Sequence, residues 1–218
     1  MYAQVVLFDK FDPLDVIAPF EVLVAGAQAL GGGLTVELVS AEGPREVVSG
    51  TQDMTLTATA ALDPAKPGYV VVPGASGPVN GDPDQGVETI PVLLARAAQT
   101  ALIPLIGKAL ANPEITVATV CGGSLVLAMG GLIDNRYATT HYMGMDVLDA
   151  TGVNAVNARV VDDGDLISGG GVTSGLDLGL YLLERSYGPR IAHAVEKLFE
   201  YERRGTAWKP SAIEPQEL

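Results

Sequence analysis

Short runs of consecutive apolar residues alternate along this chain with longer stretches in which apolar residues recur every three or four positions. The short runs are rich in valine and isoleucine and predict strands buried on both faces. The longer stretches predict helices with one face on a core. The strongest predicted strands cover residues 4–8, 34–40, 69–73, 115–120 and 166–168. The predicted helices cover residues 14–30, 86–111, 122–129, 173–184 and 189–203.

Weaker patterns fill the gaps between these elements. The polar, threonine-rich stretch 45–60 is compatible with a short β-hairpin, and residues 137–140 and 155–161 with strands flanking a helix at 144–150. Within 86–111, Pro91 marks a helix start and Pro104 a kink or break, because proline lacks the backbone N–H of a helix interior.

Strands that alternate with helices at this spacing predict an α/β fold, with a parallel sheet covered by helices on both faces. No linker or change of composition divides the chain. We expect a single domain over residues 1–205, followed by an extended tail over 206–218 that carries Pro210 and Pro215.

Composition and charge narrow the function classes. The chain has 218 residues, 48% of them hydrophobic and 18% charged, which is enough apolar material for a large core. The formal net charge is −13, from 26 acidic and 13 basic residues. A nucleic-acid interface needs clustered basic side chains, so we expect no nucleic-acid partner.

Cysteine usage and the N-terminus indicate a cytoplasmic protein. One cysteine cannot form an internal disulfide, and with two histidines it is too sparse for a typical structural zinc site, which leaves only a carboxylate-based metal site open. We expect no metal and no cofactor. The N-terminus lacks the basic segment of a signal peptide, and no uninterrupted apolar run reaches the ~20 residues of a membrane span.

Cys121 lies where a buried strand meets two glycines and the start of a helix. In open α/β sheets this edge is where ligands bind, and the arrangement is that of a nucleophile elbow. A helix N-terminus stabilises negative charge, so we predict a lowered thiol pKa and an available thiolate. The alternative is that Cys121 is a small, inert residue of the core.

Other candidates follow neighbouring strands. Asp15 opens the first helix and is either a helix cap or part of the site at the same edge. The turn at Gly74 and Ala75 is either an ordinary turn or a source of backbone N–H groups that form an oxyanion pocket with Gly122. His141, after Thr140, is either a general base or a structural hydrogen-bonding residue.

Several of these motifs together resemble the ThiJ/PfpI superfamily, which has a glutamine-amidotransferase class I-like (flavodoxin-like) fold, and within it the isocyanide hydratase group. The resemblance runs from about residue 2 to about residue 203. Its motifs lie in residues 14–22, 71–74, 120–128, 138–142 and 169–177.

The resemblance implies that Cys121 is the nucleophile, that Asp15 is its carboxyl partner and that the protein is a homodimer. Cys121 would attack the terminal carbon of an isocyanide, a small electrophilic substrate. Asp15 would protonate the adduct, and hydrolysis of the thioimidate would release an N-substituted formamide.

Two positions depart from the group's pattern. The hydratases carry threonine directly after the cysteine, where this chain has Gly122, and a second glycine is usual at the position of Ala75. The protease-like branch has histidine after the cysteine, so peptidase activity is disfavoured. Two alternatives remain: a glyoxalase- or amidase-like enzyme that uses Cys121, and a non-catalytic domain that senses a ligand or redox state.

Overall fold

Valine-rich strands form the centre of the protein, since most of their side chains have no exposure to solvent. The computed structural model describes residues 1–82, 85–211 and 213. Within that part of the chain a seven-stranded sheet has the order β10-β11-β7-β6-β1-β2-β5. The strands are β1 (Tyr2–Val6), β2 (Thr35–Ser40), β5 (Ala60–Ala61), β6 (Gly68–Val72), β7 (Ile115–Val120), β10 (Val160–Asp162) and β11 (Leu166–Gly169).

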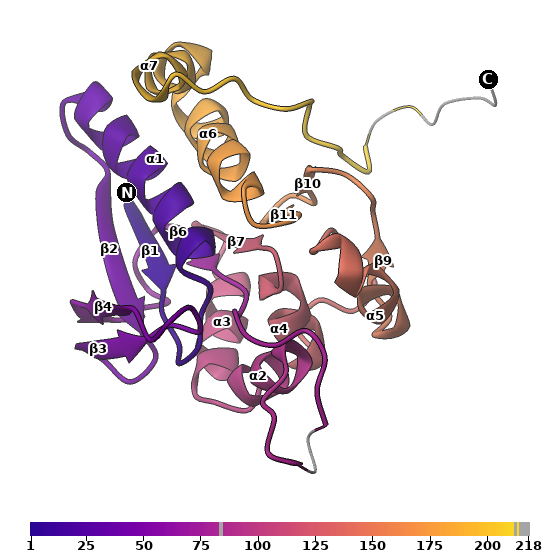
Figure 1. Cartoon of the computed structure of the whole chain (residues 1–218). Coiled ribbons are helices and arrows are strands. Elements are labelled where there is room, and N and C mark those ends of the chain that lie inside the picture. The colour runs from indigo at the N-terminus through magenta and orange to yellow at the C-terminus, as the bar shows by residue number, and fades with distance from the viewer. Residues whose placement is uncertain (83–84, 212, 214–218) are drawn as a thin grey trace.

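Neighbouring strands of this sheet run parallel, except that β10 pairs antiparallel with β11. Figure 1 shows helices on both faces, with α1 and α6 on one side and α3 and α4 on the other. The predicted α/β fold is therefore confirmed. The helices are α1 (Pro13–Leu30), α2 (Ile90–Ala97), α3 (Leu102–Leu110), α4 (Gly123–Met129), α5 (Met145–Ala150), α6 (Ser174–Tyr187) and α7 (Pro189–Phe199).

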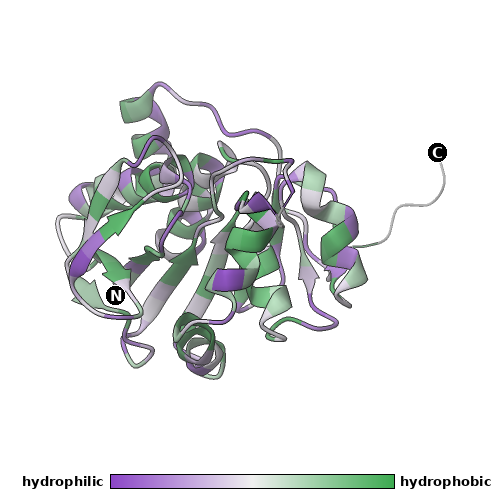
Figure 2. Cartoon of the chain, turned by 60° about the horizontal axis from the view of Figure 1, so that its bottom comes forward, coloured by the Kyte–Doolittle hydropathy of each residue, from purple (hydrophilic) through white to green (hydrophobic). Residues whose placement is uncertain are grey.

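Hydrophobic residues concentrate on the central strands and on the inner faces of the helices (Figure 2). Judged by length and composition alone, helix α1 is long and apolar enough to cross a membrane. Half of it is buried inside the protein, and it packs against α6, α7 and the sheet. Burial of this kind is typical of a core helix.

Three predicted elements differ from the structure. The helical stretch expected over 86–111 begins later, at Ile90, and its expected break is displaced from Pro104: a turn at residues 98–101 separates α2 from α3, so that Pro104 lies in the first turn of α3. The strand expected over 155–161 is wrong, because the chain bends between β9 (Asn154–Ala155) and β10. The strand expected over 137–140 is shortened to β8 (Tyr137–Ala138), which pairs with β9.

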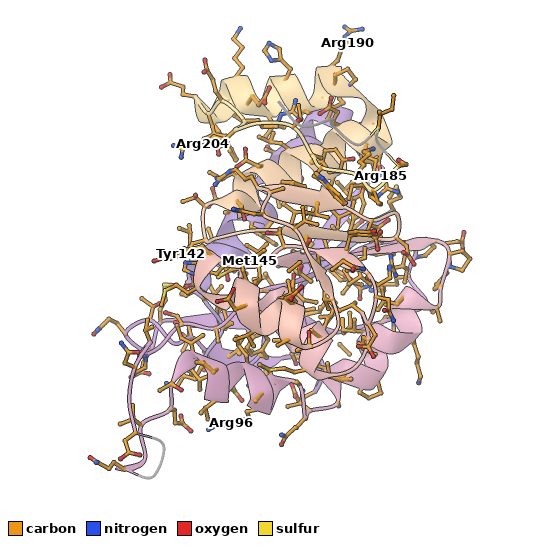
Figure 3. All side chains as sticks on the ribbon, turned by 90° about the vertical axis from the view of Figure 1, so that its right-hand side faces the viewer. Arg96, Tyr142, Met145, Arg185, Arg190 and Arg204 are labelled. Atoms are coloured by element: carbon orange, nitrogen blue, oxygen red, sulfur yellow. The ribbon has the colours of Figure 1, made fainter. Side chains whose placement is uncertain are left out.

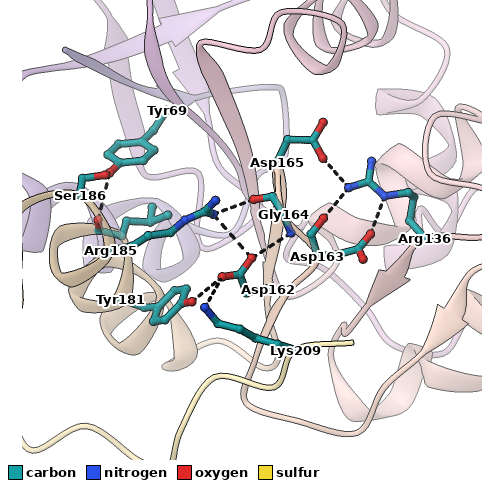
Figure 4. A network of polar contacts seen from close by, with 11 residues as sticks. Tyr69, Arg136, Asp162, Asp163, Gly164, Asp165, Tyr181, Arg185, Ser186 and Lys209 are labelled. Atoms are coloured by element: carbon teal, nitrogen blue, oxygen red, sulfur yellow. Dashed lines mark hydrogen bonds and ion pairs between the residues drawn. The ribbon is translucent and has the colours of Figure 1, made fainter. Parts of the chain in front are cut away.

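The polar stretch after β2 forms the suggested hairpin, with β3 (Arg45–Val48) antiparallel to β4 (Thr55–Ala58). After α7 the chain runs back along the far edge of the sheet. Trp208 forms a parallel bridge with Val161, and Lys209 pairs with the buried Asp162 at 3.2 Å. Figure 4 shows that Asp162 also contacts Tyr181 and Arg185 of α6, so this carboxylate joins three segments.

Candidate active site

The candidate site lies at the carboxyl edge of the sheet, where the chain leaves four strands. Asp15 follows β1, Gly74 follows β6, Cys121 follows β7 and Gly170 follows β11. Because β1, β6, β7 and β11 are parallel, their carboxyl ends meet at one edge. The topology therefore brings together residues that are far apart in the sequence.

The backbone of Cys121 is held in a strained conformation. Its φ of 55° is in the left-handed region, which non-glycine residues rarely adopt and which clusters at functional sites. The N–H of Cys121 donates to the carbonyls of Gly169 at 3.1 Å and Gly170 at 2.8 Å. Its own carbonyl accepts the Thr140 hydroxyl at 2.6 Å. Thr140 thus supports the elbow through the backbone.

Two glycines let the elbow approach the end of β6. A Cβ placed on Gly123 would lie 2.2 Å from the carbonyl oxygen of Val72, and one on Gly74 would lie 2.6 Å from the nitrogen of Gly122. Neither contact is sterically allowed. The sequence indicated that Gly122 and Gly123 permit a sharp turn. It gave no sign that the close approach of β6 requires glycine at position 123.

Asp15 is fully buried in the first turn of α1. Its Oδ2 accepts the backbone N–H of Gly74 at 2.9 Å. Its Oδ1 is buried and, among the described residues, has no partner that meets full hydrogen-bond geometry. The helix is capped by Asp12, which accepts the N–H of Leu14 at 2.9 Å. Of the two roles open from the sequence, Asp15 therefore does not fill that of the cap.

Burial raises the pKa of Asp15 well above its usual value of 3.8, and the negative charge of Asp12 adds to the effect. Hydrogen bonds with the Gly74 N–H and with Cys121 act in the opposite direction. Burial prevails because a carboxylate loses its hydration in the core. Asp15 therefore retains a proton at a pH where an exposed aspartate would have lost it.

The predicted lowering of the Cys121 pKa is wrong. Burial raises the pKa of the thiol, and the negative charge of Asp15 raises it further. A hydrogen bond from the Gly122 N–H lowers the pKa, but by less than burial raises it. Cys121 is 8% exposed, so loss of hydration outweighs the effect of the helix end. Burial therefore raises the pKa of both Cys121 and Asp15.

A cavity of about 590 Å³ opens onto the thiol. Ala75 and Gly122 line the cavity beside Cys121. Gly74 was expected to offer its N–H to an oxyanion, but in the structure that N–H donates to Asp15. The polar residues that line the cavity include Asp12, Ser76, Asn80 and His141, and the apolar ones include Ile90, Leu94, Leu125, Met129, Val147 and Val172. A larger cavity of about 1060 Å³ lies between α6, α7 and the C-terminal segment, away from Cys121.

His141 lines the cavity, and its hydrogen bond and its aromatic contact are with its neighbours in the chain. Its Nδ1 accepts the N–H of Met143 at 3.3 Å, and its ring packs on Tyr142 with centroids 4.6 Å apart. Among the described residues no hydrogen bond joins His141 to Cys121. Tyr142 is 78% exposed at the cavity mouth, and Figure 3 shows it at the surface of the protein.

Within the described part of the chain, no group of three or more His, Cys, Asp or Glu side chains could hold a metal ion. The second histidine, His193, is exposed on α7 and contacts Glu196. Beside the cavity the site offers a thiol, a carboxyl with a raised pKa and the backbone N–H groups near them.

A cysteine on a strained strand-to-helix turn, paired with a buried carboxyl from the first helix, defines a class of α/β proteins built around a nucleophile elbow. The chain belongs to the DJ-1/PfpI family, whose sequence model matches residues 94–185. It is 31% identical over 195 residues to an isonitrile hydratase from Pseudomonas putida, covering 89% of this chain and 76% of that protein.

Two further comparisons extend this result. A region of 106 residues is 32% identical to the HTH-type transcriptional regulator CdhR of Pseudomonas aeruginosa, which is 48% of this chain and 31% of the regulator. The fold matches a crystal structure of a ThiJ/PfpI family protein from Pseudomonas syringae, with a TM-score of 0.74 and 23% identity over 94% of this chain and 76% of that one.

The raised pKa of Asp15 predicts a pH-dependent difference in stability between the wild type and Asp15→Asn. The folded protein keeps the Asp15 proton to a higher pH than the unfolded chain does. The wild type should therefore lose stability relative to the variant as the pH rises from about 3.8 through the pKa of the folded state. Urea unfolding of both proteins from about pH 4 to about pH 8 measures this. A constant difference in the free energy of unfolding would contradict a raised pKa.

Proposed function

We propose that this protein is a cysteine-dependent hydratase that adds water to an isocyanide and releases an N-substituted formamide. The observation that carries the proposal is the buried pair of Cys121 and Asp15 beside a cavity, in which a nucleophile lies next to a group that holds a proton. The similarity to a protein named isonitrile hydratase supports the choice of substrate.

The first step joins the sulfur to the substrate. The Sγ of Cys121 adds to the terminal carbon of the isocyanide, and a proton passes to the same carbon, which gives a thioimidate. Asp15 is the proton donor, because its raised pKa keeps it protonated and it interacts with the thiol. The thiol proton restores Asp15, so the step has no net change in charge.

The second step consumes water. A water molecule adds to the thioimidate carbon, and one of its protons passes to the substrate nitrogen. The carbon–sulfur bond then breaks, the thiol regains its proton and the formamide leaves. Proton transfer by a positioned carboxyl typically contributes a factor of about 10² to 10⁴. Asp15 is a carboxyl close enough to Cys121 to influence the pKa of the thiol.

The cavity suits a neutral substrate with an apolar substituent. Most of the described residues that line it are apolar, and among them Asp12 is the one Asp, Glu, Lys or Arg. An anionic substrate would lie near the Asp12 carboxylate, and repulsion would disfavour its binding.

A second candidate function is ligand sensing without turnover. The similarity to part of a transcriptional regulator favours it, because 48% of this chain matches a protein that is named as a regulator. In this case the cavity would bind a small molecule, and Cys121 would react slowly or not at all.

Product formation distinguishes the two functions. The purified protein is incubated with benzyl isocyanide in H₂¹⁸O, beside a sample in which Cys121 has been alkylated with iodoacetamide. We expect N-benzylformamide that carries ¹⁸O, formed catalytically by the untreated sample and not by the alkylated one. No formamide from the untreated protein would overturn the hydratase proposal. Conversion of an α-oxoaldehyde to a 2-hydroxy acid by the untreated protein, and not by the alkylated one, would indicate glyoxalase chemistry instead.

A further inference from the structure

Asp177 is a buried carboxylate on α6, 3% exposed, that the chemistry above does not use. Its Oδ2 accepts hydrogen bonds from the Nε of Arg159 at 2.6 Å and the hydroxyl of Tyr201 at 2.7 Å. Its Oδ1 accepts the backbone N–H of Arg204 at 2.7 Å. A buried charge needs such partners, and here they come from two separate segments, Arg159 before β10 and Tyr201 and Arg204 after α7.

Arg159 connects Asp177 to the loop after β11. Its side chain, 24% exposed, also reaches the hydroxyl of Thr173 at 3.1 Å at the start of α6. Its backbone carbonyl accepts the N–H of Gly170 at 3.0 Å. One residue is therefore fastened to α6 by its guanidinium and to the glycine loop by its backbone.

The glycine loop in turn holds the elbow. The carbonyl of Gly170 accepts the N–H of Cys121 at 2.8 Å, so an unbroken series of hydrogen bonds runs from Asp177 through Arg159 and Gly170 to Cys121. Residues 169–171 are all glycine and have no side chains with which to fix their own backbone. Their position depends on the groups that bond to them.

We propose that Arg159 and Asp177 are positioning residues, which hold the glycine loop so that Cys121 stays in its strained conformation with its sulfur facing the cavity. This inference rests on the proposed role of Cys121 as nucleophile, but not on the identity of the substrate. Arg159 and Asp177 act on the reaction only through Gly170 and the backbone of Cys121.

Loosening the loop should affect catalysis and thiol reactivity in opposite directions. Turnover needs the sulfur at a fixed place, and a small misplacement of a reacting group costs a factor of roughly 10 to 100. Alkylation by a small reagent needs only access and a thiolate. Admission of water would relieve the burial that raises the pKa of Cys121, so alkylation should begin at lower pH.

The test compares Arg159→Gln with Arg159→Lys and a matched control. For Arg159→Gln we expect kcat for benzyl isocyanide to fall roughly 10-fold to 100-fold. We expect KM to stay close to that of the wild type, and the midpoint of the pH profile of iodoacetamide alkylation to shift to lower pH. Arg159→Lys keeps one donor for Asp177 and should lie between the wild type and Arg159→Gln.

The control is Arg203→Gln. Arg203 is 25% exposed and pairs with Glu184 of α6 and Glu196 of α7. Among the described residues its side chain has no hydrogen bond or ion pair with Asp177. It should lose a similar amount of stability and leave both readouts unchanged. If Arg159→Gln behaved like Arg203→Gln in kcat and in the alkylation midpoint, the positioning role would be overturned. Should the wild type not turn over isocyanides, the alkylation midpoint alone decides, so the two proposals fail separately.

Discussion

Asparagine in place of Asp15 is expected to lower the rate constant for isocyanide turnover by a factor of about 10² to 10⁴, the usual contribution of a positioned proton donor. The amide can still accept the Gly74 N–H with its oxygen, so the geometry at the start of α1 is retained. It cannot supply a proton to the substrate carbon. Initial rates of formamide formation at saturating isocyanide measure the effect.

Two control variants accompany Asp15→Asn. Cys121→Ala is the negative control and should form no formamide, because it lacks the sulfur that binds the substrate carbon. Glu21→Gln makes the same carboxyl-to-amide change on α1 at an exposed position and should keep the wild-type rate. If Asp15→Asn also kept the wild-type rate, Asp15 would not be the proton donor, although Cys121 could still be the nucleophile.

The sequence predicted the central strands well because their signal is local. A strand buried on both faces reads as a continuous apolar run, as in β6 and β7. The break between α2 and α3 had no such signal. Residues 98–101 contain no glycine or proline. In the structure the Thr100 hydroxyl donates to the Ala97 carbonyl and accepts the Leu102 N–H, and α3 packs against β7. Pro104 indicated a break near the right place but lies just inside the second helix.

The candidate site was predictable where one segment carries the pattern, as for Cys121 at the end of β7. Asp15 was suggested by its place after β1, and resemblance to the family strengthened it. The direction of the thiol pKa was not predictable, because burial of Cys121 depends on other elements packing around it. The Arg159–Asp177 pair joins residues 18 positions apart in segments with no shared motif, and only the tertiary structure reveals it.

Alanine at position 123 is expected to destabilise the protein by at least about 3 kcal/mol, the upper part of the range for an overpacked interior. Its Cβ would lie 2.2 Å from the carbonyl oxygen of Val72, and a strand backbone in the middle of the sheet cannot move aside. Relief requires the elbow to withdraw from β6. Urea unfolding should show a lower midpoint, and the surviving folded protein should have lost the geometry of Cys121.

Alanine at the preceding glycine should be far milder, which makes Gly122→Ala the matched control. Gly122 has a φ of −66°, which any residue adopts, and a Cβ there would meet the two terminal methyls of Leu94 at 3.0 Å. A side-chain end can rotate away where a strand cannot, so we expect a loss below about 1.5 kcal/mol. Equal losses at positions 122 and 123 would contradict this account.

The same contact explains how the chain accommodates glycine where the isocyanide hydratases carry threonine. Leu94, 1% exposed, fills the space beside the elbow that a side chain at position 122 would need. The two positions are therefore coupled, and Leu94→Ala should relieve most of the cost of Gly122→Ala while doing nothing for Gly123→Ala. A double-mutant cycle measures that difference. Additive losses for Gly122→Ala and Leu94→Ala would mean that Leu94 only fills the core.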